Sequence, residues 1–287
     1  MSAQVFDSRR CELGEGPLWH PLRKQLFWFD ITSRRLLSQS DGEALEWPMD
    51  EMTSAAGWVS HDTLMLVGET GFYHFDLTTG KSERIADLER DQTGTRSNDG
   101  RADPFGGYWV STMGKSAEAR AGGIYRYYKG EVRPLFPAIT IPNAISFSPD
   151  GTTAYFADTA SSHVMRQRLG AKDGWPVGDP ELFIDLSKER ISPDGAVVDS
   201  KGHFWNAQWG AYRIAEYDQD GKYVSSVSLP AANTSCPAFG GPNLTDLFCT
   251  SAMQGVNKEQ RLKNPLHGQT FVTSGDAIGQ AEHQVHL

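Results

Sequence analysis

The sequence predicts an all-β protein folded as a six-bladed β-propeller, with residues 1–287 forming a single domain. Three observations lead to this fold class. Short runs of strand length are rich in aromatic and β-branched residues, and similar units recur about every 40 to 50 residues. The 29 glycines and 15 prolines are spread evenly, which places turns at short intervals and leaves no linker between domains.

The strand-length runs lie between these turns. They cover Gln25–Ile31, Thr63–Val67, Gly107–Ser111, Thr153–Ala157 and His203–Ala207. No long stretch keeps an apolar period of 3.6 residues, so the class is all-β rather than mixed.

Six similar units contain these runs. They begin near Gly14, Ser54, Ser97, Pro142, Pro193 and Ser235. Each unit has small or polar residues, a short strand, a turn of the Pro-Asp-Gly or Asp-Pro-Phe-Gly-Gly kind and an aromatic strand. A further strand pair follows, as at Gly71–Leu77 and Gly123–Tyr128. This period and content are typical of a four-stranded propeller blade.

A propeller ring must be closed, commonly by a blade that both chain ends build. We expect Gln4–Phe6 to pair with the late strand Gln269–Thr273. The tail that follows, about residues 275–287, is expected to be a surface appendage.

Composition excludes several classes of protein. The chain has 27 Lys and Arg against 36 Asp and Glu, a net charge of −9, and no Lys/Arg run, so no nucleic-acid or anionic-membrane partner is expected. No stretch approaches the roughly 20 apolar residues that span a bilayer, and the N-terminus lacks a secretory pattern. We therefore expect a cytoplasmic protein, a monomer by default, with reduced and mostly buried cysteines at positions 11, 236 and 249.

Most catalytic signatures are absent from the sequence. Gly14-Glu-Gly16 opens a GxGxxG pattern, but Trp19 occupies its last position and a strand is expected next. There is no P-loop, HExxH or GxSxG motif, and the histidines show no ligand spacing. Nucleotide binding and serine-hydrolase chemistry are therefore unsupported.

Polar residues do recur at one place in several units, just before or at the innermost strand. They are Glu15, Asn98 with Asp99, Asn143 and Asp194. In a propeller the innermost strands line a central channel, so these side chains are expected to converge there. Carboxylate and amide oxygens suit a hard divalent cation, and three protein ligands with open positions indicate a catalytic metal site.

Each of these residues also has a purely structural interpretation. Glu15 could only start a strand, Asn98-Asp99-Gly100 could be a turn, and Asp194 lies in a Pro-Asp-Gly turn sequence. Asp150 lies in the same tripeptide after a strand, as in a plain surface turn. Asp194 instead precedes its strand, where Asn143 stands in the unit before it. Trp209 could wall the channel mouth.

Taken in order, the motifs GEGPLW, RSNDGRADP, IPNAISFSPDG and SPDGAVVDSKGHFW resemble the SMP-30/gluconolactonase family, over about residues 10–255. That family includes regucalcin and sugar lactonases. The resemblance implies one divalent metal held by Glu15, Asn143 and Asp194, with Ca²⁺ or Zn²⁺ foremost and Mg²⁺, Mn²⁺ or Fe²⁺ as further candidates. It also implies that Arg96 and Asn98 hold substrate hydroxyls.

A further glutamate follows the T-M-x motif in some members of the family. Here Gly114, Lys115 and Ser116 follow that motif's methionine, and the nearest acid is Glu118. We carry a substrate-binding role over to Glu118, although this spacing departs from the family pattern.

The resemblance implies a metal-dependent lactonase that hydrolyses a gluconolactone-like aldono-lactone to the aldonic acid. The cation would stabilise the oxyanion, and Asp194 is the candidate catalytic residue, either as general base or by orienting a water on the metal. A metal-dependent esterase or organophosphatase is an alternative, and so is a non-catalytic propeller that binds divalent cations. Glu51–Ala55, Gly114–Ala121 and Gln208–Tyr212 are the loops expected to select the lactone.

Three cations could influence that selection. Lys115, Arg120 and Arg213 would favour an anionic sugar only if they pointed inward. We expect them on the surface.

Overall fold

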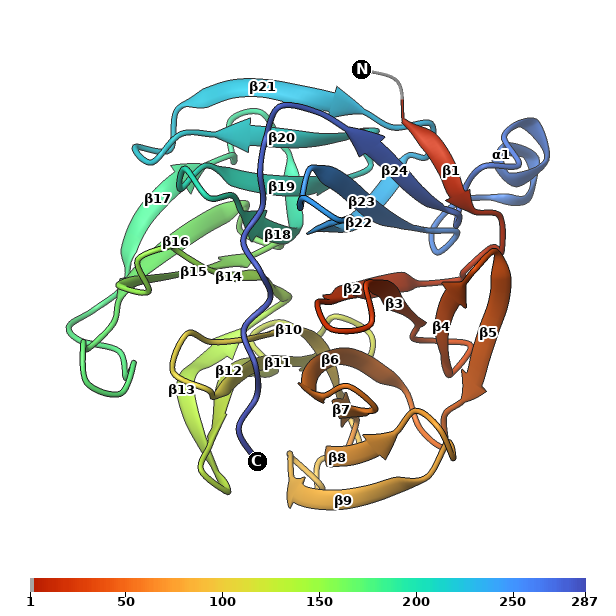
Figure 1. The fold of residues 1–287 in the computed structure, drawn as a ribbon. Helices are drawn as coiled ribbons and strands as arrows, with labels where there is room; N and C mark the ends of the chain where they lie inside the picture. Colours follow the sequence, from red (N-terminus) through yellow and green to blue (C-terminus); the bar gives the residue numbers. More distant parts are fainter. Residues whose placement is uncertain (1–2) are drawn as a thin grey trace.

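The strands of the computed structural model surround a central axis in the manner of propeller blades (Figure 1). The structure describes residues 3–287; the predicted domain range also includes Met1 and Ser2, which lie outside the described residues. Within this range the chain forms 24 strands and one short helix, α1 (Lys258–Lys263). The predicted all-β class is confirmed.

Four sheets consist of four consecutive strands each. They are β2 (Gly14–His20), β3 (Gln25–Asp30), β4 (Arg35–Ser40) and β5 (Glu43–Pro48); β6 (Thr53–Ser60), β7 (Thr63–Gly68), β8 (Gly71–Asp76) and β9 (Ser82–Asp87); β10 (Thr95–Ala102), β11 (Tyr108–Gly114), β12 (Gly122–Tyr128) and β13 (Glu131–Ile139); and β14 (Pro142–Phe147), β15 (Thr153–Asp158), β16 (His163–Arg168) and β17 (Glu181–Asp185).

The fifth sheet has eight strands. They are β18 (Ser192–Val198), β19 (Phe204–Trp209), β20 (Arg213–Tyr217), β21 (Tyr223–Ser228), β22 (Asn233–Gly240), β23 (Asp246–Ala252), β24 (Thr270–Ser274) and β1 (Gln4–Asp7). The sequence predicts six separate four-stranded blades, whereas the described residues form five sheets. The difference arises because Trp209, at the end of β19, bridges to Asn233, at the start of β22, and this one pair joins two groups of four strands.

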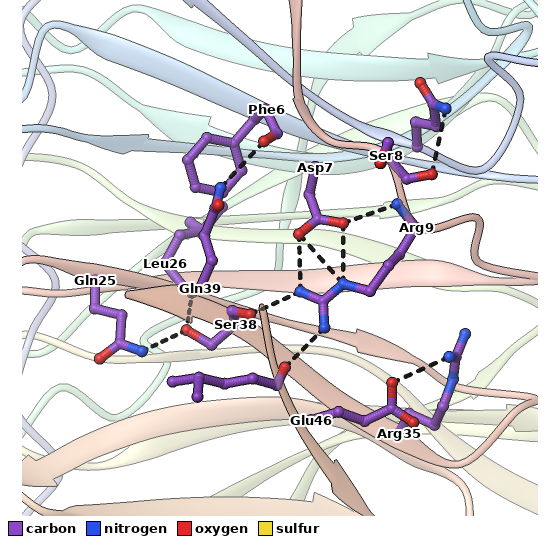
Figure 2. A network of polar contacts seen from close by, with 12 residues as sticks. Phe6, Asp7, Ser8, Arg9, Gln25, Leu26, Arg35, Ser38, Gln39 and Glu46 are labelled. Carbon is purple, nitrogen blue, oxygen red and sulfur yellow. Dashed lines mark hydrogen bonds and ion pairs between the residues drawn. The ribbon is translucent and has the colours of Figure 1, made fainter. Parts of the chain in front are cut away.

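The N-terminal strand closes the ring. β1 pairs antiparallel with β24, with Val5 opposite Phe271, which confirms the predicted pairing. The chain after β1 then bonds to the first sheet (Figure 2), where the Arg9 guanidinium donates to the Ser38 carbonyl at 2.7 Å and to the Leu45 carbonyl at 2.8 Å. The first and last sheets are therefore joined through residues 4–9.

The core lies between neighbouring sheets. Phe27 and Leu36 of the first sheet pack in one cluster with Leu64 and Phe75 of the second. Because each sheet lies between two others, its middle strands are apolar on both faces. All six residues of β3 are buried, for example. This explains why the aromatic runs were readily identified as strands.

The C-terminal segment after β24 crosses the middle of the ring (Figure 1). It is fastened there, since Val285 is buried and its N–H donates to the Trp58 carbonyl at 2.9 Å. Glu282 forms an ion pair with Arg101 of β10. The expectation of a surface appendage is therefore wrong. Backbone groups at the ends of the inner strands need partners, and this segment supplies them.

The cysteines at positions 11, 236 and 249 are free and buried, as predicted. Along residues 3–287, no helix has the length and apolar character that crossing a membrane requires.

Candidate functional site

Four of the six predicted site residues, Glu15, Asn98, Asn143 and Asp194, stand where the innermost strands depart from regular pairing. The register between inner strand and neighbour shifts from Glu15 to Leu18 in β2, from Ser97 to Gly100 in β10, from Asn143 to Ser146 in β14 and from Pro193 to Ala196 in β18. Such irregularities bend a strand locally and re-aim its side chains. Their recurrence in four strands turns the polar residues toward one place.

That place is a cavity of about 300 Å³. Its lining includes Glu15, Arg96, Asn98, Asn143 and Asp194, which are five of the six predicted site residues. Other lining residues are Leu13, Met113, Ala117, Ile141, Thr159, Ser192, Trp209 and Gln254, so Trp209 does wall the cavity. Four different inner strands supply the five polar residues; the repeat alignment predicts four of them, and the family resemblance implies Arg96.

Hydrogen bonds hold the amide groups of the site in fixed orientations. Arg96 donates to Asn98 Oδ1 at 2.9 Å, and Asn98 Nδ2 donates to Asn143 Oδ1 at 2.8 Å. Asn143 Nδ2 donates to Thr159 Oγ1 at 2.8 Å, and this hydroxyl donates to the Pro193 carbonyl at 2.6 Å. The chain of bonds links β10, β14 and β18. The second lone pair of Asn143 Oδ1 is left available to a ligand.

The site holds more negative than positive charge. Glu15, Asp99 and Asp194 are buried there together with the guanidinium of Arg96. Burial and the charge of Asp99 raise the pKa of Glu15 to about 8. Burial and the charges of Glu15 and Asp99 raise the pKa of Asp194 well above its usual range, while burial lowers the pKa of Arg96. A cation would relieve the repulsion among these carboxylates.

The residues present fit a divalent metal. Two carboxylates, Glu15 and Asp194, and the amide oxygen of Asn143 are hard oxygen donors on one cavity. The excess of negative charge favours the same kind of ion.

Asp99 is buried beside these donors, but its carboxylate bonds to backbone N–H groups of the inner strands. Its Oδ2 accepts a hydrogen bond from the Ile145 N–H at 2.7 Å, and its Oδ1 accepts one from the Gly100 N–H at 2.9 Å. Ile145 lies within the irregular part of β14, two residues after Asn143. Asp99 therefore supports the backbone that presents Asn143, and its charge acts on Glu15 and Asp194.

Glu118 is the predicted site residue that the structure does not bring to the cavity. It lies in the exposed loop after β11, and its carboxylate accepts a hydrogen bond from the Ser116 N–H at 3.1 Å. The neighbouring Ala117 lines the cavity instead. A substrate-binding role for Glu118 stays a prediction.

The three cations considered above, Lys115 and Arg120 in the loop after β11 and Arg213 at the start of β20, do not line the cavity. Lys115 forms an ion pair with Glu69 at 2.6 Å, and Arg213 donates to Gln208 Oε1 at 2.6 Å. Arg120 is exposed. In the part of the chain that the structure describes, none of the three is among the cavity's lining residues.

Sequence reasoning missed a second group that could hold a metal ion. Asp199, His203 and Glu216 have ligand atoms within 4.8 Å of one another. Trp205 pairs with Glu216 across β19 and β20, which brings this glutamate near His203. The contact depends on strand pairing, so spacing along the sequence gave no signal.

Asp199, His203 and Glu216 already form hydrogen bonds with one another or with other parts of the protein. Asp199 accepts hydrogen bonds from the Lys201 and His203 N–H groups and from Trp205 Nε1. His203 Nδ1 lies 2.7 Å from Glu216 Oε1. These bonds suffice to explain the arrangement as structural.

The cavity also has polar lining residues that were not predicted. Thr159, Ser192 and Gln254 contribute to it without belonging to any predicted ligand set. Pairing places Asn143 opposite Ala157, two residues before Thr159. For Thr159, a strand alignment within the unit could have given the signal.

Comparisons with known proteins show the family of the chain and relatives of the same fold. Residues 13–253 match the family described as SMP-30/Gluconolactonase/LRE-like region. A crystal structure of a calcium-binding protein, regucalcin, from Agrobacterium tumefaciens str. C58 is 39% identical and has a TM-score of 0.98, covering 100% of this chain and 98% of that chain. L-arabinolactonase of Azospirillum brasilense is 33% identical, covering 97% of this chain and 94% of the relative. The 6-deoxy-6-sulfogluconolactonase of Pseudomonas putida is 30% identical over 94% of each chain.

Proposed function

The chain belongs to the SMP-30/gluconolactonase family, and we propose that it is a metal-dependent sugar lactonase that hydrolyses a gluconolactone-like aldono-lactone to the aldonic acid. One observation above all supports this function. Four inner strands direct Glu15, Arg96, Asn98, Asn143 and Asp194 into one cavity. The lactonase names of two relatives support the same reaction class, hydrolysis of a cyclic carboxylic ester.

The architecture proposed for this enzyme is a single domain with six blades. The eight-stranded sheet counts as two blades in this interpretation, β18 to β21 and β22 to β24 with β1, because one residue pair connects the two groups.

Glu15, Asn143 and Asp194 are proposed to hold one divalent metal. Hard oxygen donors and the excess of buried negative charge support this assignment. Ca²⁺ and Zn²⁺ are the foremost candidates, and Mg²⁺, Mn²⁺ and Fe²⁺ are also compatible. When bound, the metal would polarise the lactone carbonyl as a Lewis acid.

The chain's own residues would bind the sugar and move the proton. Arg96 presents guanidinium N–H groups, and Asn98 its amide, to hydroxyls of the substrate. Asp194 faces the cavity and would accept the proton of the attacking water as its carboxylate. The fixed chain of bonds from Arg96 to Thr159 would keep these groups in place before the substrate arrives.

An uncharged lactone is the proposed substrate. Lys115 is paired with Glu69, and the charge of Arg96 lies among the carboxylates of Glu15 and Asp194. Among the described residues that line the cavity, Arg96 is the one cationic side chain and its charge is balanced by these carboxylates, while Leu13, Met113, Ile141 and Trp209 give the cavity apolar walls. A buried phosphate or sulfonate without a partner would be costly.

The test is initial-rate hydrolysis of a panel of aldono-lactones by protein that has been stripped with chelator and reloaded with single metals. Spontaneous opening is subtracted. We expect metal-restored turnover of uncharged lactones that falls by at least about a hundredfold in Asp194→Asn, the lower range for loss of a general base.

The matched control is Asp150→Asn. Asp150 lies in the same Ser-Pro-Asp-Gly sequence as Asp194, but its carboxylate serves an exposed turn by accepting from Ser148 and Thr152. Its loss should leave turnover unchanged. Absence of turnover on every lactone while metal is bound would contradict the proposal. An ester and organophosphate panel would then test the hydrolase alternative, and inactivity there would favour a cation-binding propeller.

A further inference from the structure

The segment after β24 fastens several sheets together at the centre of the ring (Figure 1). The Ser200 N–H after β18 donates to the Ile278 carbonyl at 2.8 Å, and the Gly279 N–H donates to the Leu244 carbonyl at 2.8 Å. Farther along, the His286 N–H donates to the Gly106 carbonyl at 2.9 Å. These three contacts reach two sheets, the eight-stranded sheet and the sheet of β10 to β13, and the bond from the Val285 N–H to the Trp58 carbonyl of β6 reaches a third.

Gln280 connects two of the inner strands that lead to the site. Its Nε2 donates to the Phe147 carbonyl at 3.1 Å, at the end of β14, and to the Val198 carbonyl at 2.9 Å, at the end of β18. β14 presents Asn143 and β18 presents Asp194. A single amide group therefore bonds to both strands.

Glu282 contacts a third inner strand, β10. It pairs with Arg101 of β10 at 2.5 Å, and both side chains are about nine-tenths buried. Arg101 also donates to the Ala196 carbonyl of β18 at 3.3 Å. Arg96 and Asn98 stand on β10, so this contact ties the substrate-binding strand to the strand of Asp194.

The C-terminal segment bonds to one end of these strands, and the site residues lie near the other end. Phe147 lies four residues after Asn143, and Val198 lies four residues after Asp194. At a strand rise of about 3.3 Å per residue, the contacts of Gln280 are roughly 13 Å from the site. Side chains from separate strands meet with constant spacing only if the strands are fixed relative to one another, and neighbouring inner strands such as β14 and β18 share no backbone ladder.

We propose that Gln280 and Glu282 are positioning residues for the site, which fix β10, β14 and β18 so that the metal ligands and substrate-binding residues converge. The proposal rests on the proposed function. It gives the C-terminal segment a role in the reaction in addition to any contribution to stability.

The test compares Gln280→Ala and Glu282→Gln with Gln284→Ala in the full chain. Gln284 stands on the same segment and also donates to a backbone carbonyl, that of Val59 at 2.6 Å. Val59 belongs to β6, which presents none of the predicted site residues. The control therefore removes a similar contact of the segment without releasing a strand of the site.

Three quantities are measured on each variant: Mn²⁺ affinity by electron paramagnetic resonance, kcat and KM for the best lactone, and the melting temperature in chelator. We expect Gln280→Ala and Glu282→Gln to weaken Mn²⁺ binding by up to about tenfold and to lower kcat, because a strand that shifts displaces the ligand it carries. A loss of about tenfold is the smallest that is typical when a direct partner of a metal ligand is removed. Gln284→Ala removes an exposed contact, so it should lower the melting temperature only slightly and leave Mn²⁺ affinity and kcat within about twofold of the parent.

The outcomes separate this inference from the proposed function. Suppose that the parent protein binds Mn²⁺ and is active. If Gln280→Ala and Glu282→Gln then match the control in Mn²⁺ affinity and kcat, the inference is overturned and the proposed function is not. Parent protein that neither binds Mn²⁺ nor hydrolyses any lactone would overturn both. Weakened Mn²⁺ binding in the two variants supports the inference even if no lactone in the panel is a substrate.

Discussion

Asp99 shows how one carboxylate can serve a site without lining it. Its side chain accepts a hydrogen bond from the Ile145 N–H beside Asn143, and its charge adds to burial in raising the pKa of both Glu15 and Asp194. Both effects act on the proposed metal ligands, one through the backbone and the other through the electric field.

The variant Asp99→Asn separates these two effects. The amide oxygen of the variant can still accept from the Ile145 N–H, but the negative charge is lost, and the amide nitrogen cannot accept from the Gly100 N–H as the second carboxylate oxygen does. We expect divalent cation binding to weaken by about tenfold, which corresponds to about 1.4 kcal/mol, because the cation then meets one fewer buried charge. Isothermal titration with Mn²⁺ measures the change.

Glu216→Gln is the control for the location of the ion. It alters the group of Asp199, His203 and Glu216, which lies outside the proposed site. Mn²⁺ binding should survive this change. Binding that is lost in Glu216→Gln and kept in Asp99→Asn would place the ion in that second group.

The sequence predicted these individual residues to different degrees. Glu15, Asn143 and Asp194 stand at equivalent points of aligned units, and the cavity they share follows from that repetition. Glu118 lies in a loop outside the repeat, where Ala117 and Arg120 have positive φ angles of 57° and 60°. No motif specifies that conformation, so side-chain directions in the loop were not predictable.

At the scale of elements, a buried histidine joins the end of β2 to the end of β6. His20 Nε2 lies 2.9 Å from the Ser60 carbonyl, and His20 Nδ1 accepts from the Arg23 N–H at 3.3 Å. This pair of bonds requires the neutral ring, which donates through Nε2. Burial lowers the pKa of His20 to about 4.

Stability should therefore fall as the pH falls. The unfolded chain takes up the proton near pH 6.5, whereas the folded protein takes it up only near pH 4. The contribution of His20 is complete above about pH 6.5, declines below it and levels off near pH 4. In His20→Gln, we expect the loss of unfolding free energy between pH 7.5 and 4.5 to be smaller by about 2 kcal/mol.

Urea unfolding of both proteins at the two pH values provides the measurement. Other titrating groups are common to both proteins, so the difference between them isolates His20. Equal losses in the parent and in His20→Gln would show that His20 does not link stability to pH.

Strand positions were more predictable than the contacts between sheets. The aromatic runs are strands because each sheet is covered on both faces, which leaves a plain pattern in the sequence. The pairing of Trp209 with Asn233, which joins β19 to β22, has no corresponding pattern in the sequence. The C-terminal segment bonds mainly through backbone groups, and Gly279 packs so closely that a Cβ there would lie 2.1 Å from Phe239 Cβ. Such a fit depends on the finished ring.

At the scale of the whole molecule, two terminal segments hold the ring together. The C-terminal segment crosses the centre, and residues 4–9 close the circumference (Figures 1 and 2). Phe6 packs against Trp28 of the first sheet and Phe248 of the last, with ring centroids 6.1 and 4.9 Å apart. The circular arrangement therefore depends on contacts between residues that are far apart in sequence, which are costly in chain entropy to form.

Arg9→Ala should destabilise the molecule more than Arg35→Ala does. The two side chains are similarly exposed, at 21% and 26%, and lie in the same network (Figure 2). Arg9 bridges Asp7 to the first sheet across the closure, and its loss leaves a buried carboxylate and two carbonyls without that donor. Arg35 bonds within one sheet, and its buried partner Asp30 keeps backbone N–H donors. We expect losses in unfolding free energy of about 3 kcal/mol for Arg9→Ala and about 1 kcal/mol for Arg35→Ala, measured by urea unfolding at pH 7. Equal losses would mean that closure adds nothing beyond an ordinary ion pair, whereas the larger loss at Arg9 would identify the N-terminal seam as a weak point of the ring.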